Sequence, residues 1–437
     1  MFYAGFARVD VTPPFGSPLA GNSHYRPADG ILDPIELNAV AFSDGERRAV
    51  LIAADFLYVM ENAATEIRKM ISQRCAIPAE RVYMQGLHPH TSVRIGSRYP
   101  MAAGLKDEDY LSVLYRKYCD VAQLALADLA PAEMGYAEKE TAEVLSYVRR
   151  YRMKDGSVRT NPGRGNPNVV GPIGEADNAV RLVRLKREGK GDLAIVNFST
   201  HPDVIGGTKI SADWPGFVRR HTERDLPGVK CILVNGCQGD ANHVDLADVE
   251  KKKHGYAHSD HMGRVIADAV LALWENTAAC PSGKVWGSVT MQYIPTNTRG
   301  MDRVDEFIAR KNRIAAGLEE APKGIQGLAE LGRISTLREE TLFQKVPVCA
   351  LCLGKVAFVG YGGEPFLRYA EATREAGRDF HLICTCLTGG GQGYLPTPEA
   401  FEEGGYEAAN SRFDSSVFEL LTGEAARLLE EYRIFCR

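Results

Sequence analysis

Short apolar runs alternate with amphipathic segments along most of the chain. Most runs contain β-branched residues and end at glycine, aspartate or polar turns, a pattern typical of buried strands. The predicted strands are 49–56, 81–85, 193–198, 230–235, 348–353, 355–361 and 381–387. The predicted helices between them are 61–75, 109–129, 214–224, 260–276 and 415–432. This alternation predicts an α/β fold in which mixed β-sheets are flanked by helices.

Two segments depart from this pattern. Residues 151–172 are rich in Gly, Pro, Asn and Arg, which predicts a long surface loop. Residues 302–340 are charged and rich in helix-forming residues, which predicts a helical insertion or arm packed on the main body. No repeat or linker composition divides the chain, so we expect residues 1–437 to form one domain.

Composition places the chain among soluble globular proteins. Apolar residues make up 45% and charged residues 25% of it, and the net charge is −4. This balance argues against nucleic-acid binding, which needs a clustered basic excess. No apolar window is long enough to predict a transmembrane helix, and the N-terminus does not resemble a signal peptide. With several of its ten cysteines in apolar runs, the chain is expected to be cytoplasmic and reduced.

Three of the histidines follow predicted strands, where loops on a rigid scaffold commonly carry function. His88 and His90 follow the strand at 81–85, and His201 follows the strand at 193–198. If the backbone stays extended, positions i and i+2 share one face. Neutral imidazole is a good zinc ligand. Taken alone, each of these histidines is also compatible with an exposed loop or with a turn in which its hydrogen bonds are satisfied.

Further polar groups lie near strand ends. Glu364 follows a Gly-Gly pair and would either point into a cleft or interact with a helix N-terminus. The stretch 388–394 is glycine-rich but lacks the spacing and the lysine of a phosphate loop. We therefore expect its glycines to let Tyr394 approach a site. Residues 235–243 form either a substrate-facing loop or an ordinary turn.

Taken in order, short motifs over nearly the whole chain resemble the catalytic domain of the neutral/alkaline non-lysosomal ceramidases. The first resembles the family's opening G-x-x-x-x-D-I-T-P-P, and the last resembles its Y-V-T-T-P-E. The motifs are Gly5–Pro14, Gly16–Gly21, the strand ending in Asp55, Leu87–Ser92, Ser211–Gly216, Gly363–Phe366 and Tyr394–Glu399. The resemblance implies one zinc ion per chain, held by His88, His201, Glu364 and Tyr394.

The resemblance also implies roles for other side chains. His90 would face the substrate and hold the scissile group or its oxyanion. Either Arg149 or Arg150 would correspond to a family arginine that contacts the reacting carbonyl, and the sequence does not choose between them. Tyr406, at the family's later Y-E position, would lie behind the metal ligands.

The chain also departs from the family. Asn242 stands where ceramidases carry a serine with an assigned catalytic role, and their immunoglobulin-like C-terminal domain has no counterpart here. We therefore predict a zinc-dependent hydrolase that cleaves an amide (N-acyl) bond of a soluble small molecule with a metal-activated water. The alternatives are a metal-dependent hydrolase of an ester or carbohydrate-derived substrate, and a non-catalytic protein that binds a small ligand. The oligomeric state is left open.

Overall fold

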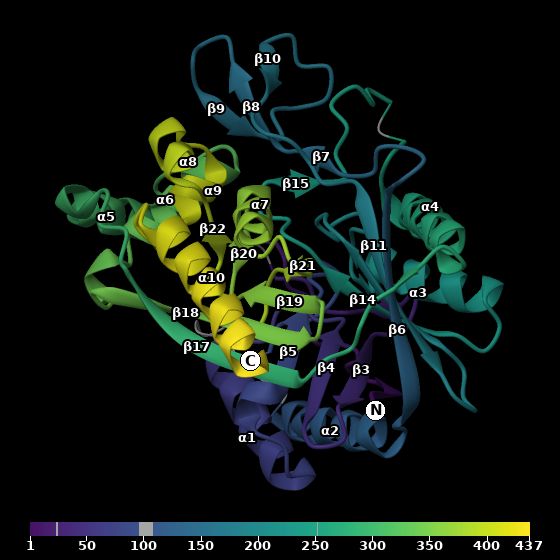
Figure 1. Cartoon of the computed structure of the whole chain (residues 1–437). Coiled ribbons are helices and arrows are strands. Elements are labelled where there is room, and N and C mark those ends of the chain that lie inside the picture. The colour runs from purple at the N-terminus through teal and green to yellow at the C-terminus, as the bar shows by residue number, and fades with distance from the viewer. Residues whose placement is uncertain (23–24, 96–107, 251) are drawn as a thin grey trace.

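The computed structural model describes residues 1–22, 25–95, 108–250 and 252–437 (Figure 1). Within these residues the largest sheet has nine strands, in the order β14-β12-β11-β6-β1-β3-β4-β5 with β16 also paired to β6. The pairs β4–β5 and β12–β14 are parallel and the others are antiparallel. The strands are β1 (Tyr3–Asp10), β3 (Glu36–Ser43), β4 (Arg48–Ala54), β5 (Val82–Gly86), β6 (Ala130–Glu140), β11 (Ala179–Arg187), β12 (Leu193–Phe198), β14 (Lys230–Asn235) and β16 (Ala278–Ala279).

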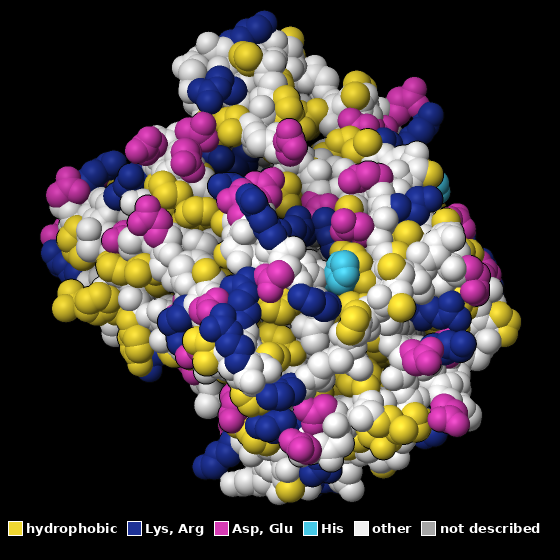
Figure 2. Space-filling view, in the orientation of Figure 1, with side chains coloured by type: hydrophobic (Ala, Val, Ile, Leu, Met, Phe, Trp, Pro, Cys, Tyr) yellow, Lys and Arg dark blue, Asp and Glu magenta, His cyan; other side chains and the backbone are white. Residues whose placement is uncertain are grey.

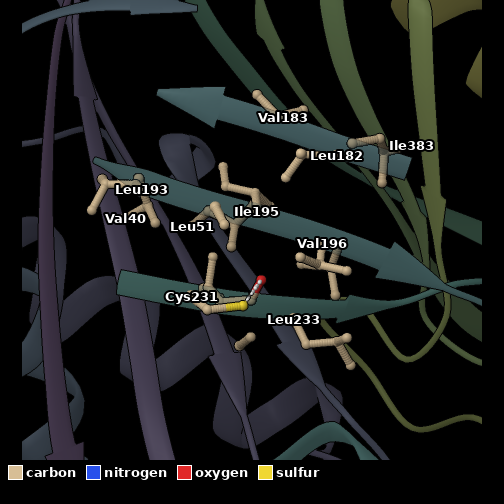
Figure 3. Close-up of a cluster of buried hydrophobic side chains, with 14 of the residues drawn as sticks. Val40, Leu51, Leu182, Val183, Leu193, Ile195, Val196, Cys231, Leu233 and Ile383 are labelled. Carbon is tan, nitrogen blue, oxygen red and sulfur yellow. Dashed lines mark hydrogen bonds between the residues drawn. The ribbon is translucent and has the colours of Figure 1, made fainter. Parts of the chain in front are cut away.

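A four-stranded sheet, β17-β18-β19-β21, packs against this large sheet. Its strands are β17 (Val285–Pro295), β18 (Phe343–Leu353), β19 (Val356–Tyr361) and β21 (His381–Thr385). Leu351 of β18 and Ile383 of β21 belong to the same buried cluster as Val40 and Leu51 of the large sheet (Figure 3). Because side chains alternate along a strand, the next residue, Cys352, packs on the other face.

Helices cover the outer faces of both sheets. Two of them, α1 (Glu61–Cys75) and α2 (Glu108–Ala127), pack on the face of β3 and β4 that carries Leu37 and Ile52. Another pair, α3 (Asp213–Asp225) and α4 (Gly255–Trp274), packs together near β14 and β11. The four-stranded sheet is covered by α7 (Leu367–Ala376) and α10 (Val417–Cys436). The predicted α/β class, with mixed sheets flanked by helices, is confirmed.

The prediction of a long loop at 151–172 is wrong. This region forms a small antiparallel sheet of β8 (Arg150–Met153), β9 (Val158–Thr160) and β10 (Val169–Pro172), which projects from the top of the molecule in Figure 1. The residues that suggested a loop lie mainly in the turns between these strands, where Gly156 and Asn161 have positive φ. Short strands between tight turns leave little hydrophobic periodicity to detect.

Residues 302–340, for which a helical arm is predicted, are largely helical. They contain α5 (Val304–Ala315) and α6 (Ile325–Ile334), and a small cluster of their own holds the two helices together. The remaining elements are short: β2 (Gly30–Ile31), η1 (Ala79–Arg81), β7 (Tyr147–Val148), β13 (Lys209–Ile210), β15 (Ala241–Asn242), η2 (Met301–Arg303), η3 (Leu337–Glu339), β20 (Glu364–Pro365), β22 (Tyr394–Leu395), α8 (Pro398–Glu403) and α9 (Tyr406–Asn410).

The surface carries charges of both signs. Figure 2 shows Lys and Arg side chains interspersed with Asp and Glu over the visible face. This mixture agrees with the small net charge of −4. Within the described part of the chain, no helix is long and apolar enough to cross a membrane.

Candidate metal centre

Three predicted ligands lie just beyond the carboxyl ends of strands that are distant in sequence. His88 follows β5, His201 follows β12 and Glu364 follows β19. His88 has φ of 79°, a left-handed conformation that bulky residues rarely adopt and that is found most often at functional sites. The backbone therefore turns at His88 and does not stay extended, which is the condition under which His88 and His90 would share one face of a strand.

A buried amide network brings these strand ends together. The Gln85 side chain in β5 donates to the carbonyls of Asn235, at 2.6 Å, and Cys386, at 2.9 Å. The Asn235 side chain in turn donates to the carbonyls of Leu87 and Thr200, both at 3.2 Å. Leu87 and Thr200 immediately precede His88 and His201 in the chain. Two buried amides thus position the two histidine-bearing segments relative to each other.

The donor atoms of the predicted ligands converge on a small volume. Oε2 of Glu364 lies 3.1 Å from Nε2 of His201 and 3.4 Å from Nε2 of His88. Nε2 of His90 lies 3.4 Å from Nε2 of His88. Donors bound tetrahedrally to zinc at 2.0–2.1 Å are separated by about 3.3 Å, so these spacings suit a metal ion.

Backbone carbonyls fix the tautomers of two of the histidines. Nδ1 of His88 lies 2.9 Å from the carbonyl oxygen of Leu57. Nδ1 of His201 lies 2.9 Å from that of Gln238 and 3.0 Å from that of Ala241. A carbonyl oxygen only accepts, so each Nδ1 carries the hydrogen and each Nε2 presents a lone pair. This is the arrangement in which surrounding groups orient histidine ligands toward a metal.

Burial and neighbouring charges set the protonation states of the cluster. Burial lowers the pKa of His88 to about 4 and that of His90 to about 3. Burial alone would raise the pKa of Glu364, but the nearby histidines and Arg149 outweigh it and lower that pKa to about 2. At neutral pH His88 and His90 are therefore neutral beside the ionised carboxylate of Glu364, the forms in which these groups bind metals.

The Nδ1–H tautomers direct the Nε2 lone pairs of His88 and His201 toward Oε2 of Glu364, so a cation between these three atoms would stabilise their contacts. Within the described residues, the ligand atoms of His88, His90 and His201 also lie within 4.8 Å of one another, as a group that can hold a metal ion. The donor set therefore fits a metal.

The structure separates the two candidate arginines. Nη1 of Arg149 lies 3.3 Å from Nε2 of His201, and its Nη2 donates to the Gly239 carbonyl at 2.7 Å. The guanidinium also pairs with the fully buried Glu407 at 2.8 Å. Arg150 donates to Glu403 and to the carbonyl of Gly404, and its Nε lies 3.9 Å from Oε2 of Glu407.

Two tyrosines lie behind the histidines. The ring of Tyr394 stacks 6.5 Å from that of His201 and under the Arg149 guanidinium, 4.9 Å away. Tyr406 meets Tyr394 edge-on, with ring centroids 5.4 Å apart. Burial raises the pKa of Tyr394, and the positive charge of Arg149 opposes that rise. Tyr394 therefore lies beside His201 and Arg149, as expected for a residue that approaches the site.

Asn242 lies in the loop that supports His201. It is buried, and its Oδ1 accepts from the backbone N–H of Val244 at 3.0 Å. The preceding residue, Ala241, supplies one of the carbonyls that hold His201. In the same loop, a Cβ on Gly239 would collide with the carbonyl oxygen of Glu364, so only glycine allows this close approach.

Sequence reasoning missed two acidic residues near the centre. Asp203 accepts from Nδ1 of His243 at 2.9 Å. Burial alone would raise the pKa of Asp203, but His243 and the site histidines lower it. Glu407, the partner of Arg149, directly follows Tyr406 in the chain. Closeness to His201 and Tyr406 in sequence was the available signal, but nothing in the sequence indicated either pairing.

The fold and this histidine cluster define an α/β protein of ceramidase-like architecture with a group that can hold a metal ion. The chain superposes on a ceramidase solved in complex with C2, with a TM-score of 0.73 and 13% identity over 99% of this chain and 75% of that one. It also superposes on the neutral ceramidase from Pseudomonas aeruginosa, with a TM-score of 0.69 and 14% identity over 98% of this chain and 75% of that one. At these identities the comparison establishes a shared fold. No protein-family model and no curated protein matches the sequence.

Proposed function

We propose that the protein is a zinc-dependent hydrolase that cleaves an amide (N-acyl) bond in a small soluble molecule. In this proposal one ion per chain is held by His88, His201, Glu364 and Tyr394. The supporting observation is the convergence of the Glu364 carboxylate with the Nε2 atoms of His88 and His201, whose Nδ1 atoms contact backbone carbonyls. The fold shared with two ceramidases favours the amide bond.

A bound zinc ion would supply a Lewis acid, which lowers the pKa of a bound water from roughly 15.7 to about 7. The protein's own groups would orient the substrate. His90 is less buried than His88 and His201, and its backbone is held by Pro202 and by Arg26. We propose that it donates a hydrogen bond to the carbonyl oxygen of the scissile amide, where negative charge develops.

Arg149 is the arginine that we place at the reacting carbonyl. Its guanidinium is held by Glu407 and Gly239 and stacks over Tyr394, so it is oriented before a substrate arrives. Arg150 would act one step away, by holding the segment that leads to Glu407.

The remaining predicted site residues receive supporting roles. Tyr406 would keep the Tyr394 ring in place through its edge-on contact. Asn242 would shape the loop that supports His201. We propose a soluble substrate because Asn242 occupies the position of the serine in the lipid-cleaving family that the sequence resembles.

The decisive experiment combines metal analysis with a substrate panel. The wild type should purify with about one zinc per chain and hydrolyse at least one short-chain N-acyl compound. His201→Ala should lose both properties, because it removes a buried ligand. The control is His261→Ala, which removes a half-exposed histidine of α4 that pairs with Glu143; it should keep both.

Each other outcome has a defined meaning. Full zinc occupancy in His201→Ala would refute the ligand assignment. Hydrolysis of O-acyl compounds alone would replace the amidase with a metal-dependent esterase. A wild type with neither metal nor activity would indicate a small-ligand-binding protein.

Arg149→Lys should lower kcat by about a hundredfold with little change in KM, as for the loss of one donor to a developing oxyanion. Lysine keeps the charge but cannot span Gly239 and Glu407 as the guanidinium fork does. Steady-state kinetics on the preferred N-acyl compound measures this. Arg150→Lys is the matched control and should cost less than about tenfold. Equal losses in the two variants would refute the choice of Arg149.

A further inference from the structure

A polar cavity of about 310 Å³ lies between the helical arm and the α8–α9 segment. Arg299 and Arg333 line it from the arm side, and Phe401, Gly405 and Ala408 line it from the other. The cavity is separate from the candidate metal centre. Tyr406 and Glu407 of α9 contact the residues of that centre instead.

Arg333 of the arm and Arg299, which precedes the arm, differ from the other arginines of the arm in their partners. Within the described residues, neither Arg299 nor Arg333 forms an ion pair with a carboxylate. Arg333 donates only to backbone carbonyls, among them that of Ala409 at 2.8 Å, and Arg299 donates to the carbonyl of Phe401. The other arm arginines that we compared do have carboxylate partners: Arg303 with Glu306, Arg310 and Arg313 with Glu319, and Arg338 with Asp305.

The two guanidiniums are also close enough to repel each other. Burial lowers the pKa of Arg333, the carboxylate of Glu330 opposes that fall, and the positive charge of Arg299 adds to it. Since neither guanidinium has an ion-pair partner among the described residues, a bound anion would accept charge-assisted hydrogen bonds from them. Planar guanidinium groups match the geometry of carboxylates and phosphates.

We propose that this cavity is a binding site for a small anion that carries a carboxylate or a phosphate group, recognised by Arg299 and Arg333. Asp302 and Glu330 also line the cavity, so the ligand should carry hydrogen-bond donors beside its anionic group. Arg333 holds the carbonyl of Ala409 in α9, so the anion would bind next to the helix that carries Glu407, the partner of Arg149.

Isothermal titration of the full-length protein with inorganic phosphate and with lactate tests this site. At least one anion should bind saturably at one site per chain. Arg299→Gln, at an exposed position, should weaken that binding roughly tenfold or more, the effect of losing a charged hydrogen-bond donor. Arg333→Gln should do the same if it folds. The control Arg338→Gln removes an exposed arm arginine outside the cavity and should bind as the wild type does.

His201→Ala tells this cavity apart from the metal centre. Retained binding in His201→Ala, together with loss in Arg299→Gln, would support the cavity. Binding that is lost in His201→Ala, or unchanged in Arg299→Gln, would overturn the proposal. Failure of both anions to bind saturably would overturn it as well.

Discussion

Glu364→Gln is expected to lower the affinity for zinc by more than about a hundredfold and to remove hydrolysis with it. Loss of a group that merely supports a ligand costs up to about a hundredfold, and Glu364 would be the charged ligand itself. The substitution keeps the size of the side chain but removes the negative charge that faces the Nε2 atoms of His88 and His201. Competition with a chelator of known affinity measures the change.

The matched control is Glu371→Gln on the following helix. Glu371 is half-exposed and pairs with Arg368, so its loss should leave metal affinity and activity unchanged. Wild-type affinity for zinc in Glu364→Gln would show that Glu364 is not a ligand, and the proposed function would then lose its main support.

Arg219→Ala is expected to lower the free energy of unfolding by about 3–5 kcal/mol, the usual cost of removing one partner of a buried ion pair. Arg219 in α3 donates through both terminal nitrogens to Asp55, at 2.9 and 2.6 Å. The Asp55 side chain is fully buried, and that of Arg219 is 3% exposed. Without the arginine, Asp55 would keep a buried charge with no cation beside it. Urea denaturation followed by circular dichroism measures the loss.

The neighbouring Arg220 provides the control. Its side chain is 42% exposed and its ion pair with Asp33 is long, at 3.4 Å. Arg220→Ala should therefore cost less than about 1 kcal/mol. Similar losses of unfolding free energy in the two variants would show that the buried Asp55–Arg219 pair stabilises the fold no more than an exposed ion pair does. Because Asp55 directly follows β4 and its carbonyl accepts from the Ser92 hydroxyl, Arg219→Ala should also loosen the His88 segment.

The fold was predictable where its hydrophobic signal was strong. The runs at 193–198 and 230–235 match β12 and β14, because strands buried on both faces read as continuous apolar sequence. The strands of residues 150–172 were missed because they are short and carry little hydrophobic periodicity. The strand β8 is defined by its pairing with β9 and β10, and the local sequence of β8 does not reveal these partners.

The candidate site could be nominated from the sequence as a set of residues but not as a geometry. His88, His201 and Glu364 were nominated from strand ends and from the family resemblance, and the structure brings their donor atoms together. The choice between Arg149 and Arg150 required the structure. Arg149 lies between β7 and β8 and reaches Nε2 of His201, whereas Arg150 begins β8 and pairs with Glu403, a difference that the sequence pattern does not carry.

Sequence alone determined the α/β class, the helical arm and the residue types available for metal chemistry, because these depend on local periodicity and on side-chain identity. The tertiary structure decided which of those groups meet. The Gln85–Asn235 network and the pairing of Arg149 with Glu407 join segments far apart in the chain. The left-handed turn at His88 lies where one of these segments leaves its strand. Such contacts form only when the whole fold closes, since no local pattern specifies which groups will meet in the interior.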